Sequence, residues 1–364
     1  MWERNGKNVA KINLNNKSIL VTGAAGFIGS NLIKRLIHDT ENVKIIGIDN
    51  MNDYYDVSLK EYRLKQLKSN SFIFIKGNIA NKELMINIFK NYNPDIVVNL
   101  AAQAGVRYSI INPDAYIESN LIGFYNILEC CRHFPVEHLI YASSSSVYGS
   151  NKKVPYSTED KVDNPVSLYA ATKKSNELMA HAYSKLYNIP STGLRFFTVY
   201  GPAGRPDMAY FGFTNKLRNG EKIKIFNFGN CKRDFTYIDD IVEGIVRIMK
   251  KAPNKVNGKD GLPLPPYALY NIGNNHPENL LDFVEILQEE LIKAKVLPDN
   301  YNFESHKELV PMQPGDVPIT YADTSALEKE FGFKPSTTLR DGLRNFAEWY
   351  AKFYCNGVNY EKEN

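Results

Sequence analysis

The feature that most limits how this chain can fold is a glycine-rich turn near its start. An apolar stretch, Ser18–Thr22, is expected to form a strand, and it runs directly into Gly23-Ala-Ala-Gly26-Phe-Ile-Gly29. Apolar residues at helical spacing over residues 27–38 predict a helix that begins inside this motif. Glycines here allow a tight turn and bring backbone N–H groups at the helix start close to a pyrophosphate. The motif therefore predicts a dinucleotide-binding unit.

Asp49 strengthens this prediction and indicates which dinucleotide is bound. It ends the second expected strand, residues 43–49, and follows the last glycine by 20 residues, the spacing of the dinucleotide fingerprint. A carboxylate in this place accepts hydrogen bonds from ribose hydroxyls and repels a 2′-phosphate. We expect NAD as the cofactor in preference to NADP.

Strands and helices continue to alternate through the first half of the chain. Apolar strands are expected at residues 72–76, 95–101 and 138–143, and helices at residues 57–68, 82–92 and 115–133. Strands of this kind separated by helices indicate a parallel sheet covered on both faces. The predicted fold class is α/β, a doubly wound parallel sheet of the Rossmann type with a smaller α/β substrate-binding domain.

The second half changes in character, and this change gives the expected domain boundaries. After a helix at 168–187 and a strand at 191–197 come loops rich in Gly, Pro and Asp, and late helices are expected at 278–294 and 339–354. The expected parts are a polar N-terminal extension (1–17), an NAD-binding domain (18–195 and about 236–275), a substrate-binding domain (196–235 and 276–355) and a C-terminal tail (356–364).

Composition excludes several classes of protein. The formal charge is only +4, and lysines are scattered among acids, as in the run with Lys60, Glu61, Arg63 and Lys65. We read such runs as solvated faces and expect no nucleic-acid partner. The four cysteines show no C-x-x-C spacing and the six histidines no ligand spacing, so no metal site is expected. The polar start and the lack of any apolar stretch of about 18 residues predict a cytoplasmic protein with no membrane partner.

A second constellation points to acid–base chemistry. Tyr169 and Lys173 are four residues apart at the start of an expected helix, a spacing that places both on one helical face. There the lysine ammonium would lower the pKa of the tyrosine phenol and make it a usable acid or base near neutral pH. The serines at 143–146 end the preceding strand, where open α/β sheets bind ligands. A hydroxyl there could share the proton of an alcohol substrate with the tyrosine.

Together these motifs resemble one family of enzymes. GAAGFIGSNL, the serine run and YAATK are similar to motifs of the extended short-chain dehydrogenase/reductases that act on nucleotide sugars. Later segments, among them LAAQAGVRYS, RFFTVYGPAGRPDM, GNCKRDFTYIDDIVEG and MQPGDVPITYAD, most closely resemble UDP-glucuronate 4-epimerases. The resemblance implies bound NAD, a UDP-sugar substrate, and interconversion of UDP-glucuronate and UDP-galacturonate through a transient 4-keto intermediate. It also implies a homodimer that packs through the helices expected at 115–133 and 168–187.

The resemblance carries over a set of catalytic and substrate-binding residues. Tyr169 would be the acid/base, with Lys173 as its partner at the nicotinamide ribose. Ser144 would touch the sugar 4-hydroxyl, and Ser146 would assist nearby. The implied substrate contacts are Ser144, Ser145, Ser146 and Tyr169 at the sugar, Thr198 and Arg205 at its carboxylate, Arg233 at the diphosphate, Asp316 at the uridine ribose, and Arg107.

The implied cofactor residues come from successive strand ends. They are Gly23, Gly26, Phe27, Ile28, Gly29, Asp49, Asn50, Asn78, Ile79, Ala101, Ala102, Gln103 and Asn120, together with Tyr169 and Lys173. Asn78 is a departure, because many relatives have Asp there to contact adenine. The amide carbonyl can still accept a hydrogen bond from the adenine amino group, but without the charge. The departure therefore bears on the affinity for the cofactor, not on its identity.

The serine run also bears on the reaction. Dehydratases and decarboxylases of the family place an acid within the corresponding motif, whereas residues 144–149 read SSSVYG and contain no carboxylate. This favours plain epimerisation of UDP-glucuronate. A UDP-glucose or UDP-N-acetylglucosamine 4-epimerase remains the alternative, and a dehydratase or decarboxylase is less favoured.

Replacing Asp49 with Ala should weaken NAD binding and relax the discrimination against NADP. Both the ribose acceptor and the charge that repels a 2′-phosphate are lost in this variant. Titration of cofactor-free protein with each dinucleotide checks the prediction. If affinity and preference both stay as they are in the unmodified protein, Asp49 does not reach the ribose.

Overall fold

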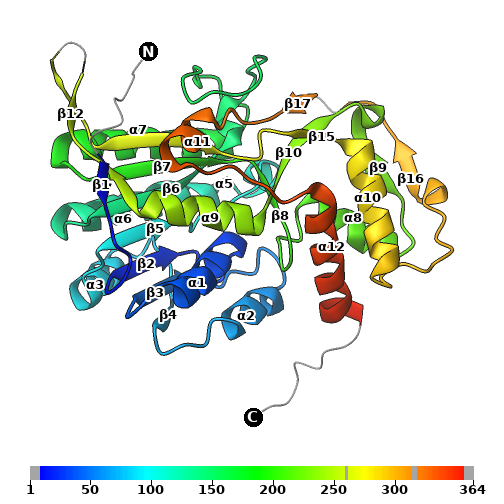
Figure 1. Cartoon of the computed structure of the whole chain (residues 1–364), viewed down its shortest axis with the longest axis horizontal. Coiled ribbons are helices and arrows are strands. Elements are labelled where there is room, and N and C mark those ends of the chain that lie inside the picture. Colours follow the sequence, from blue (N-terminus) through cyan, green and yellow to red (C-terminus); the bar gives the residue numbers. More distant parts are fainter. Residues whose placement is uncertain (1–8, 259–260, 313–317, 356–364) are drawn as a thin grey trace.

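The computed structural model describes residues 9–258, 261–312 and 318–355, and its centre is a seven-stranded sheet (Figure 1). Every neighbouring pair in this sheet is parallel. In spatial order the strands are β4 (Phe72–Lys76), β3 (Lys44–Asp49), β2 (Ser18–Thr22), β5 (Ile96–Asn99), β6 (His138–Ser144), β7 (Ser191–Phe196) and β14 (Tyr267–Ile272). The predicted α/β, doubly wound parallel fold is confirmed.

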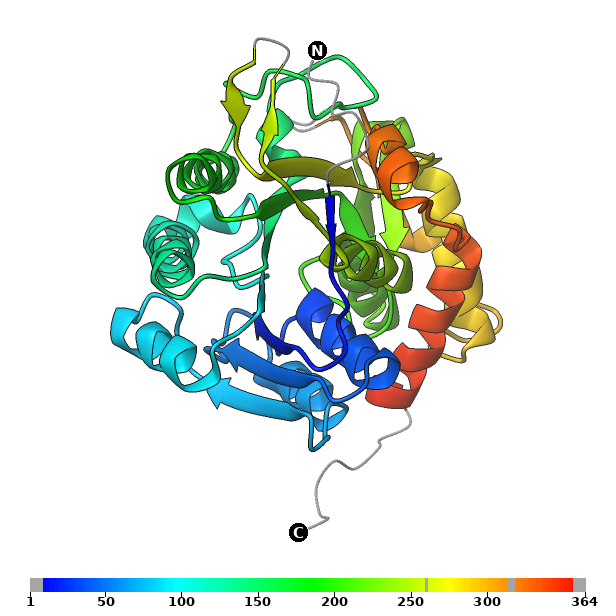
Figure 2. The same ribbon diagram turned by 60° about the vertical axis from the view of Figure 1, so that its left-hand side comes forward.

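Two hydrophobic cores lie on opposite faces of the sheet, because successive residues of a strand point to opposite sides. In β2, Ile19 and Val21 join the core that includes α1 (Phe27–Asp39), α2 (Val57–Lys65) and α9 (Ile238–Met249). Leu20 joins the other core, with α3 (Lys82–Tyr92) and α6 (Gly123–His133). Helix α7 (Leu168–Tyr187) packs beside α6. Figure 2 shows the two helical layers on either side of the sheet.

The strand order determines where a ligand can bind. From β2 the chain moves outward through β3 and β4, and it then returns to β5 on the other side of β2. The connections on the two sides of β2 therefore run in opposite directions along the sheet. Such a reversal opens a crevice at the carboxyl ends of the strands.

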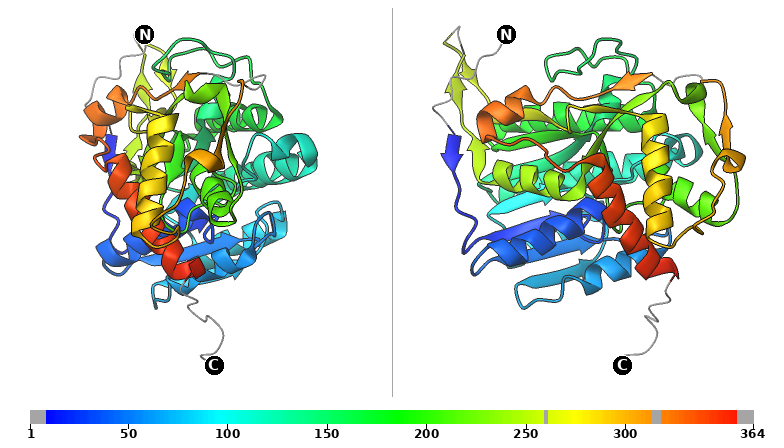
Figure 3. Two further views of the ribbon diagram at one scale, coloured as in Figure 1. Left: turned by 90° about the vertical axis from the view of Figure 1, so that its right-hand side faces the viewer. Right: turned by 45° about the vertical axis from the view of Figure 1, so that its right-hand side comes forward.

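A smaller region is built around β10 (Lys232–Tyr237), which projects to one side of the main sheet (Figure 3). Its neighbours are β15 (Pro277–Asn279), β17 (Ile319–Thr320) and β8 (Thr198–Tyr200). Close by are the paired β9 (Ile223–Ile225) and β16 (Lys307–Leu309), and the helices α8 (Ala209–Arg218), α10 (Leu280–Lys293) and α12 (Leu339–Tyr350). By contrast, α9 and β14 from residues 236–275 lie in the layers of the main sheet.

The remaining elements are short. They are α4 (Tyr108–Ile111), α5 (Pro113–Tyr116), α11 (Ser325–Phe331), β12 (Val256–Asn257), β13 (Pro263–Leu264), and single turns at Ser145–Tyr148, Phe226–Gly229 and Glu304–His306. Among the described residues no helix is both long and apolar enough to cross a bilayer. Within the same residues, no three His, Cys, Asp or Glu side chains gather as metal ligands would.

Some segments differ from their sequence-based predictions. The expected N-terminal extension joins the fold from residue 9 onward, because β1 (Val9–Lys11) pairs with β11 (Lys251–Pro253) and the apolar Ile12 and Leu14 are buried. The helix expected at 115–133 is divided into α5, a π-helical turn (Ile117–Ile122) and α6. The late helix ends at Tyr350 and continues as a π-helical turn, Ala351–Cys355. Helices α8 and α9 are additions to the predicted elements.

Candidate active site

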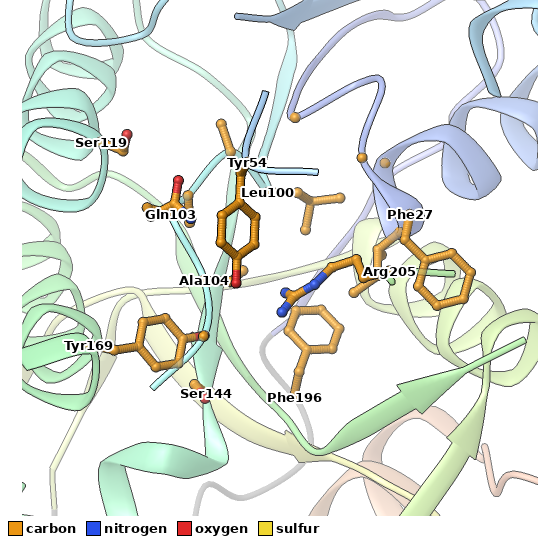
Figure 4. Close-up of a pocket in the computed structure, with 18 of the residues that line it drawn as sticks. Phe27, Tyr54, Leu100, Gln103, Ala104, Ser119, Ser144, Tyr169, Phe196 and Arg205 are labelled. Carbon is orange, nitrogen blue, oxygen red and sulfur yellow. The ribbon is translucent and has the colours of Figure 1, made fainter. Parts of the chain in front are cut away.

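The carboxyl ends of the main strands surround a cavity of about 450 Å³ (Figure 4). Residues that follow β2, β3, β4, β5, β6 and β7 contribute to its walls in turn. The expected site residues that line it are Gly23, Gly26, Phe27, Ile28, Gly29, Asp49, Asn50, Asn78, Ile79, Ala101, Ala102, Gln103, Ser144, Ser145, Ser146, Tyr169, Lys173, Thr198 and Arg205. The fold thus brings together residues from six separate loops.

The turn after β2 needs glycine at two points. Gly23 has a φ of +69°, in the left-handed region, and a Cβ there would lie 2.8 Å from the backbone nitrogen of Ala101. A Cβ on Gly29 would collide with the carbonyl oxygen of Gly23. Without these side chains, the N-terminus of α1 is open to the cavity, and its N–H groups and dipole favour an anion. The turn fits the pyrophosphate of a dinucleotide.

Asp49 is held in place at the end of β3. Its carboxylate accepts hydrogen bonds from the backbone N–H groups of Ala25 (3.1 Å) and Met51 (2.9 Å). These bonds orient it and leave lone pairs for ribose hydroxyls. Lys60 of α2 also lines the cavity, with its Nζ 3.8 Å from Asp49 Oδ1. Burial lowers the pKa of Lys60, and the charge of Asp49 partly offsets this.

The expectation that Lys60 and Arg63 belong to a solvated face is wrong. Lys60 and Arg63 are 4% and 3% exposed. Arg63 donates to the carbonyl oxygens of Ala203 and Gly204, and so ties α2 to the loop that carries Arg205. These acceptors of Arg63 lie about 140 residues away in the chain, and Lys60 donates to the backbone and side-chain oxygens of Asn52 in the loop after β3. Local sequence could not distinguish these two cations from their exposed neighbours, because tertiary folding buries them.

Asn120, expected at the cofactor, lies behind the cavity wall. Its Oδ1 accepts from the backbone N–H of Gln103 (2.9 Å), and its Nδ2 donates to the carbonyl of Gln103 (3.0 Å). Gln103 and Ser119 line the cavity, whereas Asn120 does not. Asn120 Nδ2 also donates to Thr172 Oγ1 of α7 (3.0 Å), so Asn120 positions both Gln103 and the helix that carries Tyr169.

Asn78 has partners that its sequence position did not indicate. Its Oδ1 accepts from the backbone N–H of Ala80 (2.9 Å), and its Nδ2 donates to Glu118 Oε1 (3.0 Å). The amide oxygen keeps a lone pair that adenine could use. Glu118, which the sequence did not single out, brings a carboxylate next to Asn78.

Tyr169 and Lys173 begin α7 and both line the cavity, but their electrostatics differ from the prediction. Burial raises the pKa of Tyr169, and a hydrogen bond with Ser144 and the charge of Arg205 offset this only in part. Lys173 donates to the carbonyl oxygen of Ala142 (2.9 Å), and burial lowers its pKa to about 8. The expected lowering of the phenol pKa by Lys173 is therefore not seen: burial outweighs the opposing effects of Ser144 and Arg205, and Lys173 is not among the groups that shift this pKa.

The serine run lies at the end of β6, next to Tyr169. Ser144 accepts a hydrogen bond from the backbone N–H of Ser146 (3.1 Å), which closes the turn that carries Ser145 and Ser146. Figure 4 shows Ser144 beside the phenol of Tyr169. A hydroxyl pair of this kind can bind the alcohol of a substrate and take its proton.

Arg205 and Thr198 approach from the smaller region. Thr198 begins β8, and Arg205 lies in the loop between β8 and α8. The guanidinium of Arg205 points into the cavity between Tyr54 and Phe196 (Figure 4). Tyr54 is a further lining residue that the sequence did not single out.

Two expected substrate residues, Arg107 and Arg233, are not among the described residues that line the cavity, and a third cannot be placed. Arg107 is exposed and immediately precedes α4. Arg233 lies in β10, where its Nη1 donates to the carbonyl oxygens of Lys232 (2.9 Å) and Pro318 (3.1 Å). Asp316 lies outside the described residues. The roles assigned to these three residues stay predictions.

Comparison with protein families gives a match that spans most of this architecture. Residues 19–273 match the model of the NAD dependent epimerase/dehydratase family. The protein belongs to this family. Protein CapI of Staphylococcus aureus is 55% identical over 342 residues, or 92% of this chain and 99% of that protein. UDP-glucuronate 4-epimerase 4 of Arabidopsis thaliana is 46% identical over 364 residues, or 97% of this chain and 80% of that protein.

A solved structure is also similar to this chain. UDP-glucuronic acid 4-epimerase from Bacillus cereus, crystallised with UDP-glucuronic acid and NAD, is 32% identical. It aligns with a TM-score of 0.78 over 93% of this chain and 100% of that one. The resemblance inferred from the motifs is therefore confirmed at the level of family and fold.

Replacing Tyr169 with Phe should lower epimerase turnover by about 10²-fold or more, because the ring stays but the proton acceptor is lost. Tyr183→Phe is the matched control, since Tyr183 lies on the same helix and donates to Glu129 (2.8 Å). Steady-state kinetics and the NAD content of both variants check the prediction. Turnover of Tyr169→Phe close to that of the control would exclude the phenol as the acid/base.

Proposed function

We propose that this protein is an NAD-dependent UDP-glucuronate 4-epimerase, which interconverts UDP-glucuronate and UDP-galacturonate. The observation that carries the proposal is a single cavity with a dinucleotide turn, the Tyr169–Ser144 pair and the Arg205 guanidinium. Relatives named as UDP-glucuronate 4-epimerases, from Arabidopsis thaliana and Rhizobium meliloti, are 46% and 45% identical and support it.

The chain's own residues would manage the proton and the orientation of the sugar. Bound NAD would supply the hydride acceptor and donor for C4 of the sugar, and it would be held by the glycine turn that begins at Gly23, by Asp49 and by Lys173, which all line the cavity. As the phenolate, Tyr169 accepts the proton of the 4-hydroxyl during oxidation, and as the phenol it returns that proton during reduction. Ser144 holds that hydroxyl against the phenol, and Lys173 supports the nicotinamide ribose. Each cycle leaves the protein as it began, so no external oxidant is needed.

Hydrogen-bond donors assigned to the end of the sugar that would carry a carboxylate favour a uronate substrate. The hydroxyls of Thr198, Ser145 and Ser146 and the guanidinium of Arg205 all reach the cavity. Carboxylates pair well with hydroxyl donors and with the planar fork of arginine. A fixed carboxylate is also held away from the alignment that loss of CO₂ from a β-keto acid requires, which is catalysis by positioning.

The distribution of acids favours epimerisation over dehydration. Asp49 is the one acidic residue among those that line the cavity in the described part of the chain, and it belongs to the dinucleotide end. Asp207, whose charge acts on Tyr169, does not line the cavity, and its carboxylate is engaged by the guanidinium of Arg205. General acid–base help of that kind needs a group within hydrogen-bond reach.

The unmodified protein should turn over UDP-glucuronate far better than UDP-glucose. Donors set for a carboxylate lose their partner when the sugar carries a hydroxymethyl group, at about 1–3 kcal/mol each. Two such donors give roughly 10²-fold or more in kcat/KM. Thr198→Val removes one donor at nearly constant volume, so it should erode this preference and release some UDP-pentose.

Assays with each UDP-sugar, with products separated by chromatography, check this prediction. Comparable kcat/KM for the two sugars in the unmodified protein would contradict the uronate assignment. The assignment to 4-epimerases would survive, because it depends on Tyr169, Lys173 and the glycine turn.

We further propose that two copies associate through α6 and α7. Large apolar side chains stand exposed on these helices and on the neighbouring α4 and π-turn: Ile110, Ile111, Ile117, Ile122, Tyr125, Leu178 and Leu186. Ile110 and Ile111 are 79% and 78% exposed, and Leu178 is 59% exposed. An apolar surface of this extent is typical of a protein interface, and a pair of helices on each copy would bury it.

Leu178→Glu should convert the dimer into a monomer, because it places a charge in the apolar contact. Leu309→Glu, at an exposed leucine of β16, is the matched control. Light scattering coupled to size-exclusion chromatography measures the mass of each. A dimer that persists in Leu178→Glu, or an unmodified protein that is monomeric, would contradict the proposed interface.

We also propose that the protein works in the cytoplasm. Cys130, Cys131 and Cys231 are buried and free, and a reducing compartment keeps thiols in this state.

A further inference from the structure

Asp207 lies two residues after Arg205 and holds its guanidinium. Its Oδ1 accepts from Arg205 Nε at 3.0 Å, and its Oδ2 accepts from Arg205 Nη2 at 2.6 Å. The two bonds make a bidentate pair along one edge of the guanidinium. The side chains of Arg205 and Asp207 are 27% and 28% exposed, so the pair is largely shielded from water.

The other edge of the same guanidinium remains available. Arg205 Nη1 has no hydrogen-bond partner among the described residues. Arg205 lines the cavity, whereas Asp207 does not. Figure 4 shows the guanidinium pointing into the cavity on the side of Tyr169 and Ser144. The edge formed by Nη1 and Nη2 can thus bind a second carboxylate, again in bidentate form.

Tyr54 supports Asp207 from a different part of the chain. Its hydroxyl donates to Asp207 Oδ2 at 3.4 Å. Burial and the charge of Asp207 raise the pKa of Tyr54 to about 12, so the hydroxyl remains a protonated donor. Tyr54 follows β3 of the main sheet, and its ring packs at 4.7 Å against that of Tyr108. Asp207 is therefore held by both the main sheet and the smaller region.

We propose that Asp207 is a positioning residue for uronate recognition. Asp207 holds one edge of the Arg205 guanidinium, so that the other edge faces the substrate carboxylate. The hydrogen bond from Tyr54 in turn holds Asp207 in place. The inference rests on the proposed function, because it takes Arg205 as the partner of the uronate carboxylate. A long arginine side chain that is already immobilised loses less rotamer entropy when the substrate binds. A sugar with a hydroxymethyl group in place of the carboxylate gains nothing from this arrangement.

Asp207→Asn tests the inference, because it keeps the shape of the side chain and removes the charge that holds the guanidinium. We expect kcat/KM for UDP-glucuronate to fall by about 10-fold or more, the effect of losing a hydrogen bond to a charged group. The value for UDP-glucose should change little. Tyr54→Phe should also lower the preference for UDP-glucuronate over UDP-glucose, but by less, because it removes only the hydrogen bond from Tyr54 to Asp207.

Asp299→Asn is the matched control. It removes the same charge from an exposed ion pair, in which Asp299 lies 2.6 Å from Lys295. Thermal unfolding midpoints and bound NAD show whether each variant keeps its fold. Dissociation constants of both UDP-sugars, measured by calorimetry on the NAD-bound protein, separate binding from turnover.

Three results would overturn the inference: an equal loss for both sugars, no loss for UDP-glucuronate, or tighter binding of UDP-glucuronate by Asp207→Asn. The last result would mean that Asp207 competes with the substrate carboxylate. Failure of the proposed function looks different, since the unmodified protein would then not interconvert UDP-glucuronate and UDP-galacturonate at all.

Discussion

The carboxylate of Glu177 and the guanidinium of Arg195 form a buried ion pair on which the geometry of the site depends. The Nε–Oε1 and Nη2–Oε2 distances are 2.7 Å and 2.9 Å, and the side chains are only 3% and 2% exposed. Ser143 donates to the same carboxylate at 2.7 Å. Helix α7 is thereby joined to β6 and β7 at once. Loss of one partner would leave an uncompensated buried charge, at a cost of about 3–5 kcal/mol.

This attachment controls the catalytic groups because Tyr169, Lys173 and Glu177 are spaced by four residues along one face of α7. Glu177 holds that face on the sheet, and Lys173 reaches the carbonyl of Ala142 in β6. Tyr169 is then placed against Ser144, where β6 ends. The phenol can donate and accept the substrate proton only while Tyr169 and Ser144 stay in this arrangement, since proton transfer needs hydrogen-bond contact.

Burial acts in opposite directions on the two groups of the catalytic pair. It raises the pKa of the Tyr169 phenol and lowers that of the Lys173 ammonium to about 8, because each loses hydration of its charged form. The charge of Arg205 partly offsets the effect on the phenol. The cation assigned to the substrate carboxylate therefore also acts on the acid/base, which links the recognition of the sugar to its oxidation.

The sequence by itself determined the local motifs of the site and their order along the chain. These motifs are the glycine turn, Asp49, the serine run and the Tyr169–Lys173 spacing. Each of these depends on neighbours within one turn or one strand, so the local pattern is sufficient to predict it. Only the tertiary structure decided that Lys60 and Arg63 are buried, that Asn120 stands behind Gln103, and that Tyr54 meets Asp207. The Asn120–Gln103 and Tyr54–Asp207 contacts join residues 17 and 153 positions apart. No spacing rule encodes them, because they arise where the sheet and the smaller region close on one cavity.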